Sequence, residues 1–234
     1  MELKGEIDFT RQRDWLDPTK ISETSVTICG CGGIGSFTAI ALSKLGIPKL
    51  TLIDPDIIEV HNIPSQFYIR GSEGHPKVEE LALQCTNFGA SEIDIFVAKI
   101  TEEGFEAEQE NEFPTRLRGI VIAALDSMKA RKDLWNQVKG NIRIPLFIDS
   151  RLGGTNIVIY SGQPHNPEFI KKYEESLFSD EEARPESCTR QAIIDVGFQV
   201  SSLLTRNIRK HLAGEEVESE IFFDQDQLIV MKRK

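Results

Sequence analysis

The sequence predicts an α/β fold with a doubly wound, mostly parallel sheet of the Rossmann-like kind. Short apolar runs rich in β-branched residues alternate along the chain with segments of helical spacing, as they do where helices connect parallel strands. A glycine-rich turn joins the first run to the first helix, and an aspartate follows three of the runs (Asp54, Asp126 and Asp149). Since an open parallel sheet binds its ligands at the carboxyl ends of its strands, we expect a ligand site there.

The first half of the chain predicts a βαβ unit, an irregular connection, and a further helix and strand. The predicted strands are 25–29, 49–53 and 93–97, the predicted helices are 34–45 and 76–88, and the connection is 55–75. Gly46 and Pro48 end the first helix, and Pro76 suits the first position of the second.

The second half continues the alternation. The predicted strands are 119–125, 144–148, an extended run at 156–160 and two short strands within 220–231, and the predicted helices are 127–138 and 191–212. An acidic connection covers 101–113, and a polar crossing loop with a short helix inside it covers about 161–187. We interpret residues 1–234 as a single domain.

The composition favours some classes of binding partner over others. The net charge is −10, with 37 acidic and 27 basic side chains, so the overall field repels nucleic acid and anionic membrane surfaces. The first twenty residues are too charged for a signal peptide, and no apolar run approaches the roughly 20 residues that span a bilayer. We therefore expect a cytoplasmic protein with a protein or small-molecule partner.

The glycine-rich turn predicts a nucleotide site. Gly30, Gly32, Gly33 and Gly35 satisfy G-x-G-x-x-G between a strand and a helix, where backbone N–H groups approach phosphates. Asp54, nineteen residues after Gly35, is placed to accept hydrogen bonds from ribose hydroxyls. The glycines alone would also suit close helix–strand packing, and an NAD-dependent oxidoreductase would use the same turn and the same acid.

Six motifs occur in an order that resembles the ThiF/MoeB/E1 superfamily, whose members activate ubiquitin-like proteins. They are F-T-R-Q at 9–12, G-C-G-G-I-G-S at 30–36, L-I-D-P-D-I-I-E at 52–59, H-N-I-P-S-Q at 61–66, G-H-P-K at 74–77 and L-D-S-M-K-A-R at 125–131. The resemblance extends from about Phe9 to Leu212. It implies the ThiF/E1 adenylation fold and an adenylyltransferase that uses ATP and Mg²⁺.

The resemblance also assigns site residues. Asp54 takes the ribose, Asn62 and Lys77 contact the phosphates, and Asp126 binds the metal or poises the α-phosphate; Asp56 and Gln66 belong to the same nucleotide-binding motifs. Adenylyl transfer needs such a set, because charge spreads over the phosphoryl oxygens in the transition state. The alternatives are a helix-surface role for Lys77 and a helix N-cap role for Asp126; Arg131 is interpreted as structural.

Arg11 matches an arginine that, in this superfamily, reaches across a twofold interface into the partner subunit's site. The resemblance therefore implies a homodimer, although Arg11 alone is also compatible with a solvated surface position. Ser65 departs from the family pattern, which has an arginine before the glutamine. Arg70 and Arg13 are candidates to replace the missing cation, but spacing favours neither.

Cys188 stands just before the helix predicted at 191–212, where related enzymes that form a thioester carry their cysteine. The positive end of that helix and Arg190 would lower the pKa of its thiol. A packing role is the alternative. Cys85 is expected in the core, and a zinc site at Cys29 and Cys31 is disfavoured because the glycine turn must stay free for phosphates.

The predicted function is ATP-dependent adenylation of the C-terminal carboxylate of a ubiquitin-like protein with a glycine tail, with possible thioester formation on Cys188 and an E2-like acceptor. Two alternatives stay open. One is the NAD-dependent oxidoreductase, and the other is a non-catalytic E1-like half-site subunit, which Ser65 favours.

Overall fold

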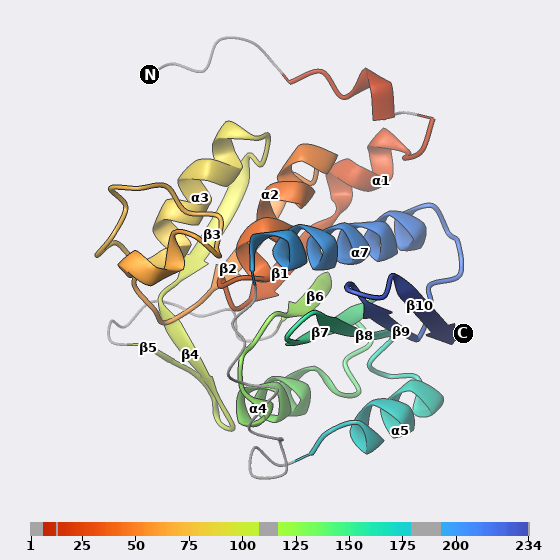
Figure 1. The fold of residues 1–234 in the computed structure, drawn as a ribbon. Helices are drawn as coiled ribbons and strands as arrows, with labels where there is room; N and C mark the ends of the chain where they lie inside the picture. Colours follow the sequence, from red (N-terminus) through yellow and green to blue (C-terminus); the bar gives the residue numbers. More distant parts are fainter. Residues whose placement is uncertain (1–6, 13, 108–116, 179–192, 234) are drawn as a thin grey trace.

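The computed structural model describes residues 7–12, 14–107, 117–178 and 193–233. Five strands form a parallel sheet, and three antiparallel strands extend it at one edge, in the order β10-β9-β8-β7-β6-β1-β2-β3 (Figure 1). The parallel strands are β1 (Ser25–Cys29), β2 (Lys49–Ile53), β3 (Glu92–Phe96), β6 (Ile120–Ala123) and β7 (Phe147–Gly153). The extension consists of β8 (Asn156–Gly162), β9 (Glu220–Asp224) and β10 (Ile229–Arg233). The predicted fold class is confirmed.

Helices cover both faces of this sheet (Figure 1). One face carries α2 (Gly35–Leu45), α3 (Lys77–Asn87) and α7 (Ile194–Leu212), and the other carries α4 (Met128–Val138) and α5 (Pro167–Glu175). A short helix α1 (Pro18–Glu23) precedes β1, and two 3-10 turns are η1 (Thr10–Gln12) and η2 (Val60–Asn62). Within the described ranges, no helix has the length and the apolar character that crossing a membrane requires.

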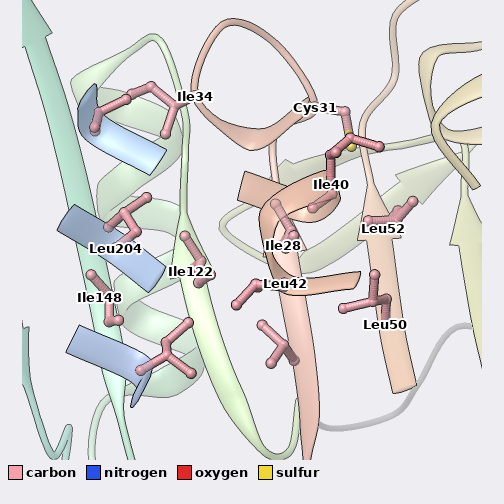
Figure 2. Close-up of a cluster of buried hydrophobic side chains, with 14 of the residues drawn as sticks. Ile28, Cys31, Ile34, Ile40, Leu42, Leu50, Leu52, Ile122, Ile148 and Leu204 are labelled. Atoms are coloured by element: carbon pink, nitrogen blue, oxygen red, sulfur yellow. The ribbon is translucent and has the colours of Figure 1, made fainter. Parts of the chain in front are cut away.

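Two apolar cores follow from the alternation of side chains along the central strands. Figure 2 shows the core beneath α2 and α7, where Ile28, Ile122 and Ile148 of adjacent strands lie side by side. Their neighbours in sequence, such as Val121 and Phe147, face the opposite way and pack with α4 and α5. Burial on both faces explains why these strands are continuous apolar runs.

Two sequence predictions about the strands are wrong. The strand expected at 144–148 begins at Phe147 and continues to Gly153, because β8 pairs with it in antiparallel register to its end. Asp149 therefore lies inside a strand and not after one. Part of the connection expected at 101–113 belongs to a hairpin of β4 (Ala98–Thr101) and β5 (Gly104–Ala107), which packs on α4.

Candidate functional site

The glycine turn between β1 and α2 contains glycines of two kinds. A Cβ at Gly30 would lie 2.3 Å from the Ala124 carbonyl oxygen, and one at Gly35 would lie 1.8 Å from that of Gly30. Close packing of the backbone therefore requires glycine at both positions. A Cβ at Gly32 would meet only Gln66 Nε2, at 3.9 Å. The space in front of Gly32 is open, which close packing does not explain.

That space belongs to a cavity of about 600 Å³, within the range of ordinary small-molecule sites. It lies beyond the carboxyl ends of β1, β2 and β6, where the strand order reverses. The predicted site residues that line it are Gly30, Gly32, Gly33, Asp54, Asp56, Gln66, Lys77 and Asp126. Gly35 and Asn62 are not part of its lining.

Asp54 holds the glycine turn in place. Its buried carboxylate accepts hydrogen bonds from the backbone N–H groups of Cys31, at 2.6 Å, and Asp56, at 2.8 Å. The Tyr68 hydroxyl donates to the carbonyl oxygen of the same cysteine at 2.7 Å. Burial raises the pKa of Asp54, and nearby Lys77 partly offsets this. The contact with a ribose stays a prediction.

Lys77 is not a helix-surface lysine. It is the first residue of α3, its side chain is only 8% exposed, and its Nζ lies 2.7 Å from Asp56 Oδ2. Burial lowers the pKa of Lys77, but the carboxylates of Asp54 and Asp56 raise it, and the net effect is a pKa above the ordinary value. The ammonium group therefore stays charged against the cavity.

Gln66 and Asn62 occupy different surroundings, although they belong to one motif. Gln66 Oε1 is buried and has no hydrogen-bond partner among the residues that the structure describes. Asn62 Oδ1 accepts from the Glu59 backbone N–H at 2.9 Å and so caps η2. Its contact with phosphate stays a prediction. Arg70 is exposed and not part of the cavity lining, and Arg13 lies outside the described residues.

Asp126 lies in the turn between β6 and α4, exposed on the cavity wall. It is not the helix N-cap, because Ser127 Oγ accepts from the Ala130 backbone N–H at 3.2 Å. Within the described part of the chain its carboxylate makes no hydrogen bond or ion pair. No cluster of three or more candidate metal ligands occurs there either, so a metal would need ligand oxygens besides Asp126.

The ThiF family model matches residues 12–228. The chain belongs to the ThiF family. Ubiquitin-like modifier-activating enzyme 5 of Drosophila ananassae is 32% identical to it over 126 residues, which are 48% of this chain and 30% of the relative. tRNA threonylcarbamoyladenosine dehydratase of Bacillus subtilis (strain 168) is 29% identical over 89 residues, 37% of this chain and 35% of the relative. The chain thus spans about a third of the length of these relatives.

Solved structures show the same fold at low sequence identity. MccB of E. coli, solved with ATP, has a TM-score of 0.68 and 18% identity, and the match covers 92% of this chain and 65% of that one. PaaA has a TM-score of 0.67 and 16% identity over 92% of this chain and 74% of that one. The fold shared with these structures therefore includes nearly all of this chain.

The cavity is also lined by residues that sequence reasoning missed. Arg151, Leu152 and Phe178 line it together with Lys99 of β4. Arg131, expected to be structural, is buried beside Asp149 and also forms part of the wall. A signal for Arg151 exists in hindsight: it stands two residues after Asp149 in one strand, so both side chains lie on the same face of the sheet.

The structure does not test the catalytic roles predicted for Arg11 and Cys188 in this ThiF-family chain. Arg11 is exposed in η1 and is not part of the lining, so its role across a dimer interface stays a prediction. Cys188 lies outside the described residues.

The described cysteines are free and buried, Cys85 as expected. Burial raises the pKa of Cys29 to about 12 and that of Cys85 to about 11. Burial also raises the pKa of Cys31 well above its ordinary range. These three thiols are therefore poor nucleophiles.

Proposed function

We propose that this ThiF-family chain uses ATP and Mg²⁺ to adenylate the C-terminal carboxylate of a ubiquitin-like protein. The observation that carries the proposal is the single cavity shared by the open glycine turn, Lys77 and Asp126. These groups come from three separate connections of the sheet, and their chemistry together suits a nucleotide triphosphate with a metal ion.

The residues present fit ATP. Gly32 leaves room for phosphate at the start of α2, and Ile34, the N-cap residue of that helix, makes no side-chain cap. Gln66 Oε1 is a buried acceptor that a hydroxyl or amino group of the ligand would satisfy. The carboxylates of Asp54 and Asp56 offer acceptors for ribose hydroxyls.

The residues also fit Mg²⁺. This ion is usually held by one or two protein carboxylates together with phosphate oxygens and water, and Asp126 is an exposed carboxylate without a partner in the described chain. ATP, when bound, supplies an electrophilic α-phosphorus and pyrophosphate as leaving group. A carboxylate oxygen of the substrate would form a bond to that phosphorus as the bond to pyrophosphate breaks. Lys77 would stabilise the negative charge on the phosphates.

The substrate class is supported by the names of relatives and neighbours. One relative is named as an activating enzyme for a ubiquitin-like modifier, and MccB was solved with the peptide MccA. A glycine tail would suit a narrow approach to the α-phosphate. The relative named for tRNA belongs to another branch, and the net charge of −10 disfavours nucleic acid as a substrate here.

Three further parts of the proposal are a role for Arg11, a role for Cys188 and an acceptor protein. Arg11 would act across a homodimer interface, Cys188 would capture the acyl group as a thioester, and an E2-like protein would accept it. The alternative function is a non-catalytic half-site subunit. It is favoured by Ser65 and by the position of Arg70 away from the cavity lining.

Titration calorimetry with ATP·Mg²⁺ and with NAD tests the nucleotide first. We expect binding of ATP·Mg²⁺ and none of NAD, and the reverse would support the oxidoreductase. Exchange of labelled pyrophosphate into ATP, driven by a ubiquitin-like protein ending in glycine, then tests the reaction. We expect exchange that Asp126→Asn abolishes. ATP binding without exchange for any tail would favour the half-site subunit.

A further inference from the structure

A fully buried carboxylate lies beside the cavity. Asp149 in β7 is 0% exposed, and it accepts from three side chains. Its donors are Arg131 of α4, Arg151 of β7 at 2.7 Å and the Tyr173 hydroxyl of α5 at 3.1 Å. A buried carboxylate with this set of partners is compensated for the loss of hydration. The cluster thus joins the sheet to both helices of this face.

Arg131 connects this cluster to the turn that carries Asp126. Its Nη1 donates to Asp149 Oδ1, and its Nη2 donates to the backbone carbonyl oxygen of Leu125, the residue before Asp126. The Arg131 side chain is only 6% exposed. A planar guanidinium presents several donors in fixed directions, whereas an ammonium group is a single point of charge. Lysine would therefore not reproduce both contacts.

The turn has few other restraints. The Ala124 backbone N–H donates to the Cys29 carbonyl oxygen at 2.8 Å, and Ser127 caps α4. Between these two points, the Arg131 contact fixes the Leu125 carbonyl oxygen. The orientation of that peptide sets the direction in which the next residue leaves the turn.

We infer that Arg131, oriented by Asp149, is a positioning residue that holds the Asp126 carboxylate toward the cavity for its metal. This inference rests on the proposed function, in which Asp126 binds Mg²⁺ together with ATP. Arg131 touches neither group in the proposed scheme and acts through the Leu125 peptide. Replacing Arg131 should therefore weaken ATP binding in the presence of Mg²⁺ and leave ATP binding without Mg²⁺ nearly unchanged.

The other arginine of the cluster is directed elsewhere. Arg151 donates to the carbonyl oxygen of Ser176 at 2.8 Å and to its Oγ at 3.0 Å, at the end of α5. The same carboxylate thus orients two guanidinium groups, and only that of Arg131 reaches the Asp126 turn. A remote pair provides a matched control: Arg206 binds Glu218 through two contacts of 2.8 and 2.9 Å, and neither residue lines the cavity.

The experiment measures the Kd of ATP by calorimetry in Mg²⁺ and in EDTA, and the ratio of the two values is the Mg²⁺ gain. We expect Arg131→Lys and Asp149→Asn each to lower this gain about tenfold or more. The Kd in EDTA should change less than about threefold, because the glycine turn and Lys77 are untouched. Arg206→Lys should keep the wild-type gain. In the Asp126→Asn background, Arg131→Lys should cause no further loss, since both changes remove one interaction.

Several results would overturn the inference. It would be overturned if Arg131→Lys and Asp149→Asn both kept the Mg²⁺ gain of the wild-type protein. It would also be overturned if adding Arg131→Lys to Asp126→Asn lowered the gain further than Asp126→Asn alone. Failure of both variants to fold at 10 °C would also count against it, because the cluster would then hold the fold and not the site. If wild-type protein binds no ATP, the proposed function itself fails. If Asp126→Asn removes the gain and the Arg131 and Asp149 variants keep it, this inference alone fails.

Discussion

Lys77 Nζ lies 2.7 Å from Asp56 Oδ2 on the wall of the cavity, and the lysine side chain is nearly buried while the aspartate side chain is 60% exposed. The pair places one enclosed positive charge beside the glycine turn. An incoming phosphate would compete with Asp56 for this ammonium group.

Replacing Lys77 by methionine should weaken ATP binding about 10- to 100-fold, because a hydrogen bond to a charged group contributes about 1.5–3 kcal/mol. Calorimetry measures this directly. Lys49→Met is the matched control: Lys49 pairs with Glu92 at 3.3 Å on the surface, away from the cavity. An equal loss in the control would contradict a specific role for Lys77.

Two glycines of the turn should respond differently to alanine. Gly30→Ala should lower the free energy of unfolding by about 2 kcal/mol or more, because its φ is +95° and a Cβ would overlap the Ala124 carbonyl group. Gly32→Ala should keep the stability within about 0.5 kcal/mol and still weaken ATP binding, since its Cβ enters only open cavity. Denaturant unfolding and calorimetry on both variants separate the effects. Unchanged ATP affinity in Gly32→Ala would contradict the phosphate position.

The sequence predicted some of the residues that line the cavity and missed others. The turn and Asp54 were found because a glycine pattern and a strand-end aspartate have local signatures, whereas Lys77 and Asp126 were named from the resemblance of their motifs to the family. Asp149 was misplaced because its strand continues by pairing with β8, a contact between segments that no local pattern reveals. Arg151 and Lys99 were missed for the same reason: the first lies in that extension, and the second lies in β4, a hairpin strand that the sequence did not predict.

Glu218 gives a pH dependence of stability that is independent of the cavity. Its hydrogen bonds with Arg206 lower the pKa of its carboxyl group, although burial opposes this. A lowered folded-state pKa stabilises the protein above the unfolded-state value, and this stabilisation is lost as the pH falls toward the folded-state value. Wild-type protein should therefore exceed Glu218→Gln by about 2 kcal/mol at pH 7, and the difference should shrink below about pH 5. A constant difference from pH 7 to pH 3 would contradict this.

Asp126→Asn should leave the free energy of unfolding within about 0.5 kcal/mol of wild type, because the carboxylate is exposed and Ser127 caps the helix. The same variant should lose the Mg²⁺ gain in ATP affinity. Thermal unfolding and calorimetry on one preparation measure both. A large loss of stability would show that this carboxylate supports the fold.

A crystal structure with a non-hydrolysable ATP analogue and Mg²⁺ tests the central claim most directly. It should place the phosphates against the backbone of Gly32 and within hydrogen-bond distance of Lys77 Nζ, with the metal on the Asp126 carboxylate. A nucleotide bound away from the turn, or one with both side chains directed away from its phosphates, would contradict it.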